Sequence, residues 1–269
     1  MPHVAALYRY PVKGFTPETP DSLFVQPDGR IQGDRVLAFR FGNAVEPLIR
    51  DGLNYWPKAE GLAMQDFPGI GPLQLRFDEE QQRLHIQHNG DVLVDAGLDE
   101  KGRALLCDRV AAYVLETPEG ERLREPDRLP LALIGDGHTS QFQDRPRGFV
   151  SVHGRGSVLA LGEALGREVD ERRFRSNIAV EGLAPWDELQ WAGRVRIGAA
   201  EFVVSHQIVR CLATHANPET GERDAPVMTT LTRTFGQEQP TLGTLLLPAG
   251  GTAEAGAAIH LGDQVEVLD

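Results

Sequence analysis

The chain has 269 residues, of which 41% are hydrophobic and 25% are charged, and its formal net charge at pH 7 is −12. This composition indicates a soluble globular protein with two domains or one large β-rich domain, and the acidic balance argues against general nucleic-acid binding. Because it has two cysteines, no apolar run near the ~20 residues of a membrane helix and no signal-like start, we expect a cytoplasmic protein without membrane contact or a disulfide framework.

The first hundred residues carry mainly strand signals. Apolar runs bounded by Gly, Pro or Asp predict strands at residues 4–10, 35–41 and 73–77. The clearest element is a hairpin, because residues 83–88 and 91–95 alternate apolar and polar side chains around Asn89-Gly90, a pair that favours a two-residue turn. His85 and His88 fall on the polar side of this pattern or at its end, so we interpret them as solvent-facing rather than metal-ligating.

A polar, proline-punctuated segment at residues 116–130 is the best candidate for a domain boundary. It predicts an N-terminal domain at residues 1–120 and a C-terminal domain at residues 130–269. In the second domain, Ser157 is placed to cap a short amphipathic helix that ends before Gly166. Strands are predicted at residues 194–197, 201–208, 258–261 and 264–268, and a helix at residues 226–235. Such strands are typical of a compact β-barrel with one opening covered by the helix.

The two cysteines differ in their surroundings. A thiolate needs nearby positive charge or a metal to form at neutral pH, and Arg210 supplies that charge beside Cys211. Cys107 is followed by Asp108 and lies in an apolar run that is typical of a helix end or a strand start. A single cysteine is otherwise most often a small buried hydrophobic side chain. Context therefore favours Cys211 alone as a ligand for a soft metal.

A basic cluster precedes a predicted strand in the second half. Residues 172–175 contain three arginines, directly followed by Ser176 and Asn177. Basic runs of this kind are often solvated edges, but this one is also a candidate anion site. It opens an ordered series that continues with Glu181-Gly182, Trp186-Asp187-Glu188, Trp191, Gly198, Arg210-Cys211, Asn217-Pro218-Glu219-Thr220-Gly221 and Gly262-Asp263.

This series resembles the MOSC domain, named for the C-terminal domain of molybdenum-cofactor sulfurases, over roughly residues 130–269. In the first half, Tyr10-Pro11-Val12-Lys13-Gly14 and Gly33-Asp34-Arg35 are similar to the opening signature of two-domain members such as the mitochondrial amidoxime-reducing component and its bacterial relatives. The resemblance implies a mainly β fold with a few short helices. In that fold a MOSC-type β-barrel packs against an N-terminal β-barrel-like domain.

The same resemblance implies that the chain binds the molybdenum cofactor, a molybdopterin dithiolene that carries molybdenum, and requires no pyridoxal phosphate. Cys211 is the implied metal ligand and catalytic residue. The residues that would hold the cofactor are Lys13, Arg35, His153, Ser157, Arg175, Asn177 and Arg210. Three positions depart from the family pattern, because Gly14 stands where serine is frequent, Asn217 where aspartate is common and Ser176 where proline is usual. These departures leave the choice of substrate open.

The implied activity is a two-electron reduction of small N-hydroxylated substrates such as hydroxylamines and amidoximes. The chain shows no dinucleotide fingerprint, no cysteine set for an iron–sulfur cluster and no flavin motif, so the electrons are expected from a separate reductase. The alternative is a carrier of sulfur or of the molybdenum cofactor that uses Cys211 without turnover. A third possibility is a barrel that has lost its cofactor. We interpret Trp186 and Trp191 as packing residues, and expect neither His206 nor His215 to bind the metal.

Overall fold

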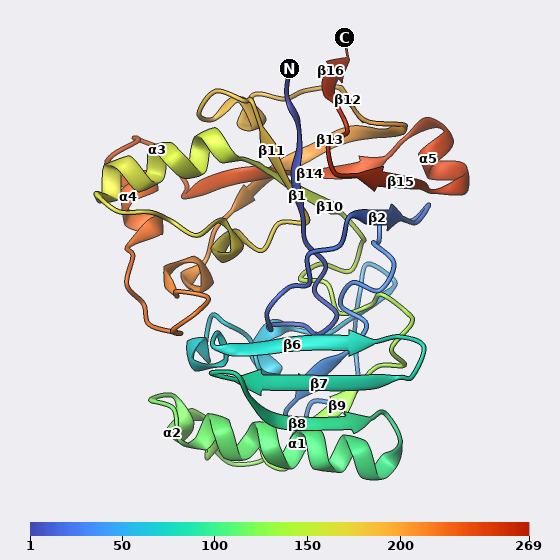
Figure 1. The fold of residues 1–269 in the computed structure, drawn as a ribbon, viewed down its shortest axis with the longest axis vertical. Helices are drawn as coiled ribbons and strands as arrows, with labels where there is room; N and C mark the ends of the chain where they lie inside the picture. Colours follow the sequence, from blue (N-terminus) through green and yellow to red (C-terminus); the bar gives the residue numbers. More distant parts are fainter. Residues whose placement is uncertain (269) are drawn as a thin grey trace.

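The computed structural model of the protein describes residues 1–268 and has two lobes (Figure 1). The upper lobe is built on a seven-stranded sheet with the order β1-β11-β10-β14-β13-β12-β16. Its strands are β1 (His3–Leu7), β10 (Val150–Gly154), β11 (Ile178–Glu181), β12 (Arg194–Ile197), β13 (Ala200–Val209), β14 (Thr241–Pro248) and β16 (Val265–Leu268). A bridge between His3 and Gln264, and a 2.8 Å hydrogen bond from the Val4 amide to the Asp263 carbonyl, join the two edges of the sheet. The sheet therefore closes into a barrel.

The interior of the barrel is apolar because inward-facing apolar residues alternate with outward-facing polar residues along the strands. In β12, for example, Val195 and Ile197 are buried while Arg194 and Arg196 are exposed. The only parallel pair in this described sheet is β10 with β11, and α3 (Arg155–Leu165) lies in the crossover that a parallel pair requires. The helix α4 (Val227–Arg233) packs beside α3 on the same side of the barrel (Figure 1).

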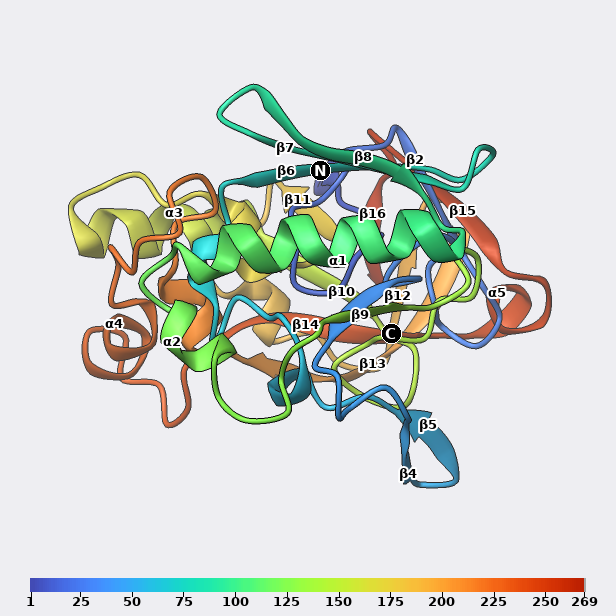
Figure 2. The same cartoon turned by 90° about the horizontal axis from the view of Figure 1, so that it is seen from below.

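The lower lobe holds a three-stranded antiparallel sheet, β6 (Leu73–Asp78), β7 (Arg83–His88) and β8 (Asp91–Gly97), against which α1 (Glu100–Leu115) packs. Figure 2 shows α1 running alongside this sheet, and the short β4 (Leu48–Arg50)–β5 (Leu53–Tyr55) hairpin projecting away from the body. The pair β3 (Ala38–Arg40) and β9 (Ala132–Ile134) contributes to the same hydrophobic core as β6–β8, α1 and α2 (Gly120–Leu123). The predicted mainly β fold class, with its barrel, is confirmed.

The predicted hairpin is confirmed, and three of the four strands predicted for the barrel form β12, β13 and β16. The fourth, predicted at residues 258–261, forms β15 (Ala257–His260) and pairs with Ser22–Val25 outside the barrel sheet. Asn89 and Gly90 both have positive φ, 53° and 86°, as the two-residue turn between β7 and β8 requires. Gly166 ends α3 in the left-handed conformation with φ of 66°. In the C-terminal half of the chain, α5 (Gly250–Ala255) and β15 (Ala257–His260) precede β16.

Two local predictions are wrong. Cys107 lies in the middle of α1, at neither a helix end nor a strand start, because Asp99 caps the helix well before it through a 2.7 Å hydrogen bond from the Gly102 amide. Ser157 does not cap α3, since the helix begins at Arg155 after Gly154, and the Ser157 side chain is buried inside it.

The two lobes share segments of chain. β1 pairs with β11, and β2 (Ser22–Val25) pairs with β15, so the first 25 residues contribute strands to the upper lobe. Conversely, β9 pairs with β3 in the lower lobe. The domain boundary at residues 120–130 stays a prediction, and these pairings bring residues from both ends of the chain together. Among residues 1–268, no helix combines the length and the apolar character that crossing a membrane would need.

Candidate cofactor site

Cys211 lies directly beyond the barrel strand β13 and is partly exposed. It has extended backbone geometry and begins the short helical turn η5 (Leu212–His215), where its carbonyl accepts a 3.0 Å hydrogen bond from the Thr214 amide. Cys107, by contrast, is buried, and burial raises the pKa of its thiol to about 11. Only Cys211 is therefore an accessible thiol among the described residues, which suits a metal ligand.

Arg210, the residue before Cys211, has a buried side chain that links three segments of the upper lobe. Its Nε donates to the Leu242 carbonyl at 2.7 Å and its Nη1 to the Phe174 carbonyl at 2.6 Å. Its Nη2 lies 3.4 Å from Ser176 Oγ. Burial lowers the pKa of Arg210 to about 10, so the side chain remains charged at neutral pH. These bonds tie the end of β13 to β14 and to the arginine-rich turn, and the predicted contact of Arg210 with a cofactor stays a prediction.

Arg35 and Arg175 meet on the ring of Tyr10, although 140 residues separate them in the chain. Their guanidinium carbons lie 5.0 Å and 4.3 Å from the ring centroid. Arg35 pairs with Asp34, and Arg175 donates from Nη1 to the Phe15 carbonyl at 2.7 Å. Burial and the neighbouring Arg35 lower the pKa of Arg175. The structure thus brings together two of the residues that the sequence selected from opposite halves.

Lys13 is buried and belongs to the same neighbourhood, but its ammonium group is fully engaged. Nζ donates to the carbonyls of Phe142 at 2.9 Å and Gln143 at 3.1 Å, and to Asp144 Oδ1 at 2.8 Å. An ammonium group has three donors, so none remains for another ligand. Partial burial would raise the pKa of Asp144, but Lys13 and two further cations outweigh it and hold this pKa well below its usual range.

We call the group Lys13, Arg35, Lys58 and Arg175 the cation cluster. These four cations face two carboxylates, Asp34 and Asp144, which leaves a surplus of two positive charges in a protein of net charge −12. Within residues 1–268, no hydrogen bond uses Arg35 Nε or the Nε and Nη2 of Arg175. Unused guanidinium donors in a region of surplus positive charge fit an anionic group such as a phosphate.

A small crevice is lined both by Arg175 of the cation cluster and by residues that follow Cys211 in the chain. Its lining includes Phe15 and Met64 and, two and five residues after Cys211, Ala213 and Ala216. Arg172 and Arg173 also line it, but each is paired with a carboxylate. The free positive charge of this crevice therefore comes from Arg175.

The other three predicted cofactor residues are buried within the upper lobe. Asn177 Oδ1 accepts a 2.7 Å hydrogen bond from Ser151 Oγ, and its Nδ2 donates to the Tyr8 carbonyl at 3.2 Å. Ser157 Oγ donates to Glu188 at 2.8 Å. His153 has no exposed surface and lies 3.5 Å from Glu171. The structure does not bring these residues onto the surface that Arg35 and Arg175 present, and their contact with a cofactor stays a prediction.

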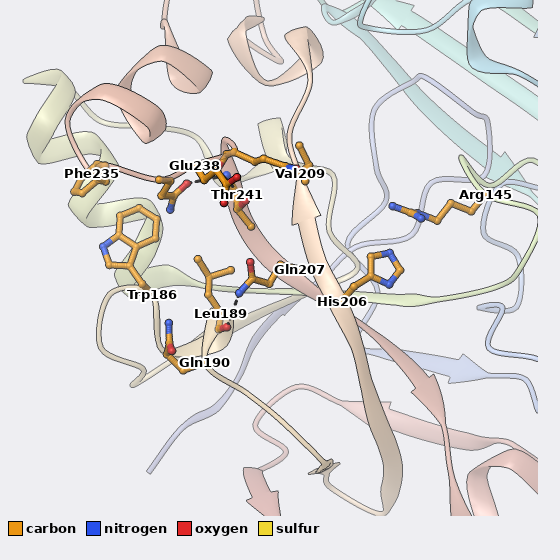
Figure 3. A pocket seen from close by; sticks show the side chains of 12 residues that line it. Arg145, Trp186, Leu189, Gln190, His206, Gln207, Val209, Phe235, Glu238 and Thr241 are labelled. Atoms are coloured by element: carbon orange, nitrogen blue, oxygen red, sulfur yellow. Dashed lines mark hydrogen bonds between the residues drawn. The ribbon is translucent and has the colours of Figure 1, made fainter.

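A second hollow, a groove of about 810 Å³, crosses β13 and includes Val209, two residues before Cys211 in the chain (Figure 3). Trp186 and Phe235 form one of its walls, with ring centroids 4.6 Å apart. The other lining residues are Arg145, Leu189, Gln190, His206, Gln207, Val209, Gln237, Glu238, Gln239 and Thr241. β13 changes register twice, at Val204/His206 and at Gln207/Val209, so that neighbouring residues of one strand reach the same groove.

Two residues of this region were missed by the sequence reasoning. Asp144 stands alone in a polar stretch, and only the fold shows that it meets Lys13 across 131 residues. Tyr10 was noted as part of a motif, but its role as the platform for both arginines was not. The signal for Tyr10 was its position three residues before Lys13 in that motif, whereas Asp144 had no local signal.

Residues 140–266 match the family model described as the MOSC domain. Similar curated proteins include the molybdenum cofactor sulfurases of Caenorhabditis briggsae, 30% identical over 199 residues, and of Drosophila grimshawi, 41% identical over 115 residues. These alignments cover 68% and 42% of this chain but only 27% and 13% of those longer proteins.

Two solved structures are also similar. The YuaD protein from Bacillus subtilis has a TM-score of 0.40 and 11% identity, and the alignment covers 98% of this chain and 94% of that one. YiiM from Geobacillus stearothermophilus has a TM-score of 0.33 and 16% identity, with 45% and 54% of the two chains covered.

Proposed function

Because residues 140–266 of this chain match the family model of the MOSC domain, we propose that the protein is a molybdenum-cofactor-dependent oxidoreductase that reduces N-hydroxylated substrates. The name of the curated relatives, molybdenum cofactor sulfurase, supports a function linked to this cofactor. In the proposed reaction the substrate N–O bond is broken, and two electrons and two protons yield water and either the amine, from a hydroxylamine, or the amidine, from an amidoxime. A separate reductase is the proposed source of the electrons, as the sequence predicts.

The observation that carries the proposal is the meeting of Arg35 and Arg175 on Tyr10, with unused donors, next to the turn that Arg210 ties to Cys211. A pterin phosphate needs positive charge and several donors, whereas molybdenum needs a soft ligand such as a thiolate. Both requirements are met within one connected set of residues. A purely structural barrel would require neither an accessible thiol nor unused arginine donors.

In this proposal each residue of the site has a distinct role. Cys211 provides the thiolate ligand, and Arg35 and Arg175 bind the phosphate with charge-assisted hydrogen bonds. Lys13 adds positive charge, but its three donors bind residues 142–144. Its role is therefore to hold that segment in place. When bound, the cofactor supplies the two-electron redox centre, and the protein supplies binding and orientation.

The test combines metal content with a thiol substitution. Protein from a host that makes the cofactor should contain molybdenum by elemental analysis and reduce an amidoxime when an artificial electron donor is supplied. Cys211→Ser should lose at least about 99% of this activity, because the metal loses its protein ligand. Cys107→Ala is the matched control, since Cys107 is buried in α1 and should leave activity unchanged. Wild-type activity in Cys211→Ser would refute the ligand assignment, and metal-free protein from such a host would refute the function.

A carrier of sulfur or of the cofactor is the second candidate, and the sulfurase name of the curated relatives favours it. In that case Cys211 would hold a persulfide, and its partial exposure would allow transfer. Mass spectrometry distinguishes the two candidates. A labile extra sulfur on Cys211, with no reduction of any N-hydroxylated compound by metal-loaded protein, would favour the carrier.

A further inference from the structure

Trp186 has a backbone conformation that large side chains rarely adopt. Its φ of 72° lies in the left-handed region, where a bulky residue is strained unless its surroundings hold it there. The Trp186 amide donates a 2.8 Å hydrogen bond to Ser157 Oγ, and this hydroxyl donates to Glu188 Oε2 at 2.8 Å. Ser157 and Glu188 have no exposed surface. A buried polar pair thus holds Trp186 in a strained conformation, and residues held in this way are concentrated at binding sites.

The Trp186 ring forms the aromatic wall of the groove together with Phe235 (Figure 3). Both rings also pack against the hydrophobic cluster that α3 and α4 build, but both remain partly exposed. The indole Nε1 of Trp186 is not buried and has no hydrogen-bond partner among residues 1–268. Packing accounts for the covered parts of the two rings, whereas the parts that face the groove offer a flat ligand a surface to lie against.

Two glutamine side chains of the groove have amide groups of known orientation. Gln207 Nε2 donates to the Leu189 carbonyl at 2.8 Å (Figure 3). Gln237 Oε1 accepts a 2.7 Å hydrogen bond from the Thr241 amide. Because a backbone carbonyl only accepts and a backbone amide only donates, these partners determine which way each side-chain amide points. The atoms left without a partner among the described residues are therefore Gln207 Oε1, an acceptor, and Gln237 Nε2, a donor.

The charges of the groove balance. Among the described residues that line it, Arg145 and Glu238 are the charged ones, and they have opposite signs. His206 also lines the groove, and partial burial together with the nearby Arg145 lowers the pKa of His206, so its imidazole is neutral at neutral pH. The lining therefore fits a polar ligand without net charge.

We propose that the groove binds a flat, uncharged heteroaromatic molecule, with its ring against Trp186, a donor on Gln207 Oε1 and an acceptor on Gln237 Nε2. The class of ligand is a heterocyclic amide, because its N–H and C=O groups supply one donor and one acceptor on the rim of a flat ring. Ser157 and Glu188 are positioning residues that hold Trp186 in place. The inference goes beyond the proposed function, since it uses no residue of the cation cluster and needs no cofactor.

The test measures binding to the full chain by calorimetry with two ligands that differ in one hydrogen-bond donor. Carbostyril is a flat cyclic amide with an N–H and a C=O group, and N-methylcarbostyril lacks the N–H. Gln207→Met should weaken carbostyril binding by about 2–10-fold, the value of one neutral hydrogen bond, and leave N-methylcarbostyril unaffected. Gln237→Met should weaken both ligands to a similar extent, because both keep the carbonyl group. Trp186→Leu should weaken both by about 5–150-fold, as expected for a lost stacking surface.

Ser157→Ala tests the positioning role. It should weaken both ligands, and combining it with Trp186→Leu should cost no more affinity than Trp186→Leu alone, because Ser157 acts through Trp186. Glu238→Gln is the matched control, since it removes a charge from the same groove and should not change the binding of uncharged ligands. Thermal unfolding checks that each variant is folded, and Gln207→Met and Trp186→Leu keep the proposal testable if Ser157→Ala is not.

Three results would overturn the inference. They are no binding of carbostyril to wild type at millimolar concentration, unchanged binding in Trp186→Leu, and an equal loss for the two ligands in Gln207→Met. The molybdenum content of the protein bears on the proposed function alone, because these measurements use neither metal nor electron donor.

Discussion

The buried Arg210 side chain gives the sharpest stability prediction. In Arg210→Met, the carbonyls of Leu242 and Phe174 lose their donors at 2.7 Å and 2.6 Å. Hydrogen bonds to charged groups contribute about 1.5–3 kcal/mol each, so two of them amount to roughly 3–6 kcal/mol. The longer bond to Ser176 adds little. Because water can reach part of the site after truncation, we expect a loss of about 3–5 kcal/mol in the free energy of unfolding.

Urea denaturation followed by circular dichroism measures this loss, and thermal unfolding should shift downward by roughly 10 °C. Arg210→Lys should fall between wild type and Arg210→Met, since an ammonium group cannot reach acceptors on both sides in the way a planar guanidinium does. Arg233→Met is the matched control, because Arg233 is exposed in the last turn of α4 and should change stability by less than about 0.5 kcal/mol. A stability of Arg210→Met equal to that of wild type would refute the view that this side chain ties β13 to the arginine-rich turn.

Two further predictions concern the frame of the site. Gly243→Ala should cost about 2–4 kcal/mol, because Gly243 has φ of 81° and a Cβ there would lie 2.5 Å from the Val152 carbonyl oxygen. Gly166→Ala, with φ of 66° but no atom within 4 Å of the new Cβ, should cost only about 1 kcal/mol in the same urea assay. Burial and two nearby arginines lower the pKa of His215, whose Nε2 accepts a hydrogen bond from the Met228 amide. The stability contributed by neutral His215 is therefore present above the ordinary pKa of about 6.5 and is lost as the pH falls below it. Between pH 7.5 and 5.5, the free energy of unfolding of wild type should fall by up to about 1 kcal/mol more than that of His215→Gln. Equal losses in the two proteins would contradict this assignment.

Local sequence rules predicted the elements whose structure depends on neighbouring residues. The hairpin at Asn89-Gly90 follows from the positive φ that its turn needs, and the end of α3 at Gly166 follows from the same preference. The signals of α1 were also present, because Asp99 is a favourable cap and Leu106, Val110 and Val114 recur every four residues. Reading the short run around Cys107 by itself hid this longer period.

Residues of the candidate site could be predicted only where they belong to a recognisable sequence motif. Arg35 and Arg175 were selected through family motifs, and the structure places them together. The engagement of Lys13 with residues 142–144 depends on a contact between segments that are about 130 residues apart. No local pattern encodes such a contact, because this segment has neither periodicity nor turn chemistry that points to its partner. Asp144 therefore became visible only in three dimensions.

The arginines of this region separate into two kinds, and the difference locates the binding function. Arg210 uses all three of its nitrogen atoms on protein acceptors, as a side chain with a structural role does. Arg175 uses one, and it is half-buried, repelled by Arg35 and only partly compensated by the ring of Tyr10. The unused Nε and Nη2 of Arg175 and the Nε of Arg35 are not among the buried polar atoms without a partner, so these donors are open to a ligand. An anion bound at Arg35 and Arg175 would satisfy these donors and remove the repulsion between them. The open donors of Arg35 and Arg175, which Arg210 lacks, thus indicate that this pair, rather than Arg210, forms the part of the site that binds a ligand.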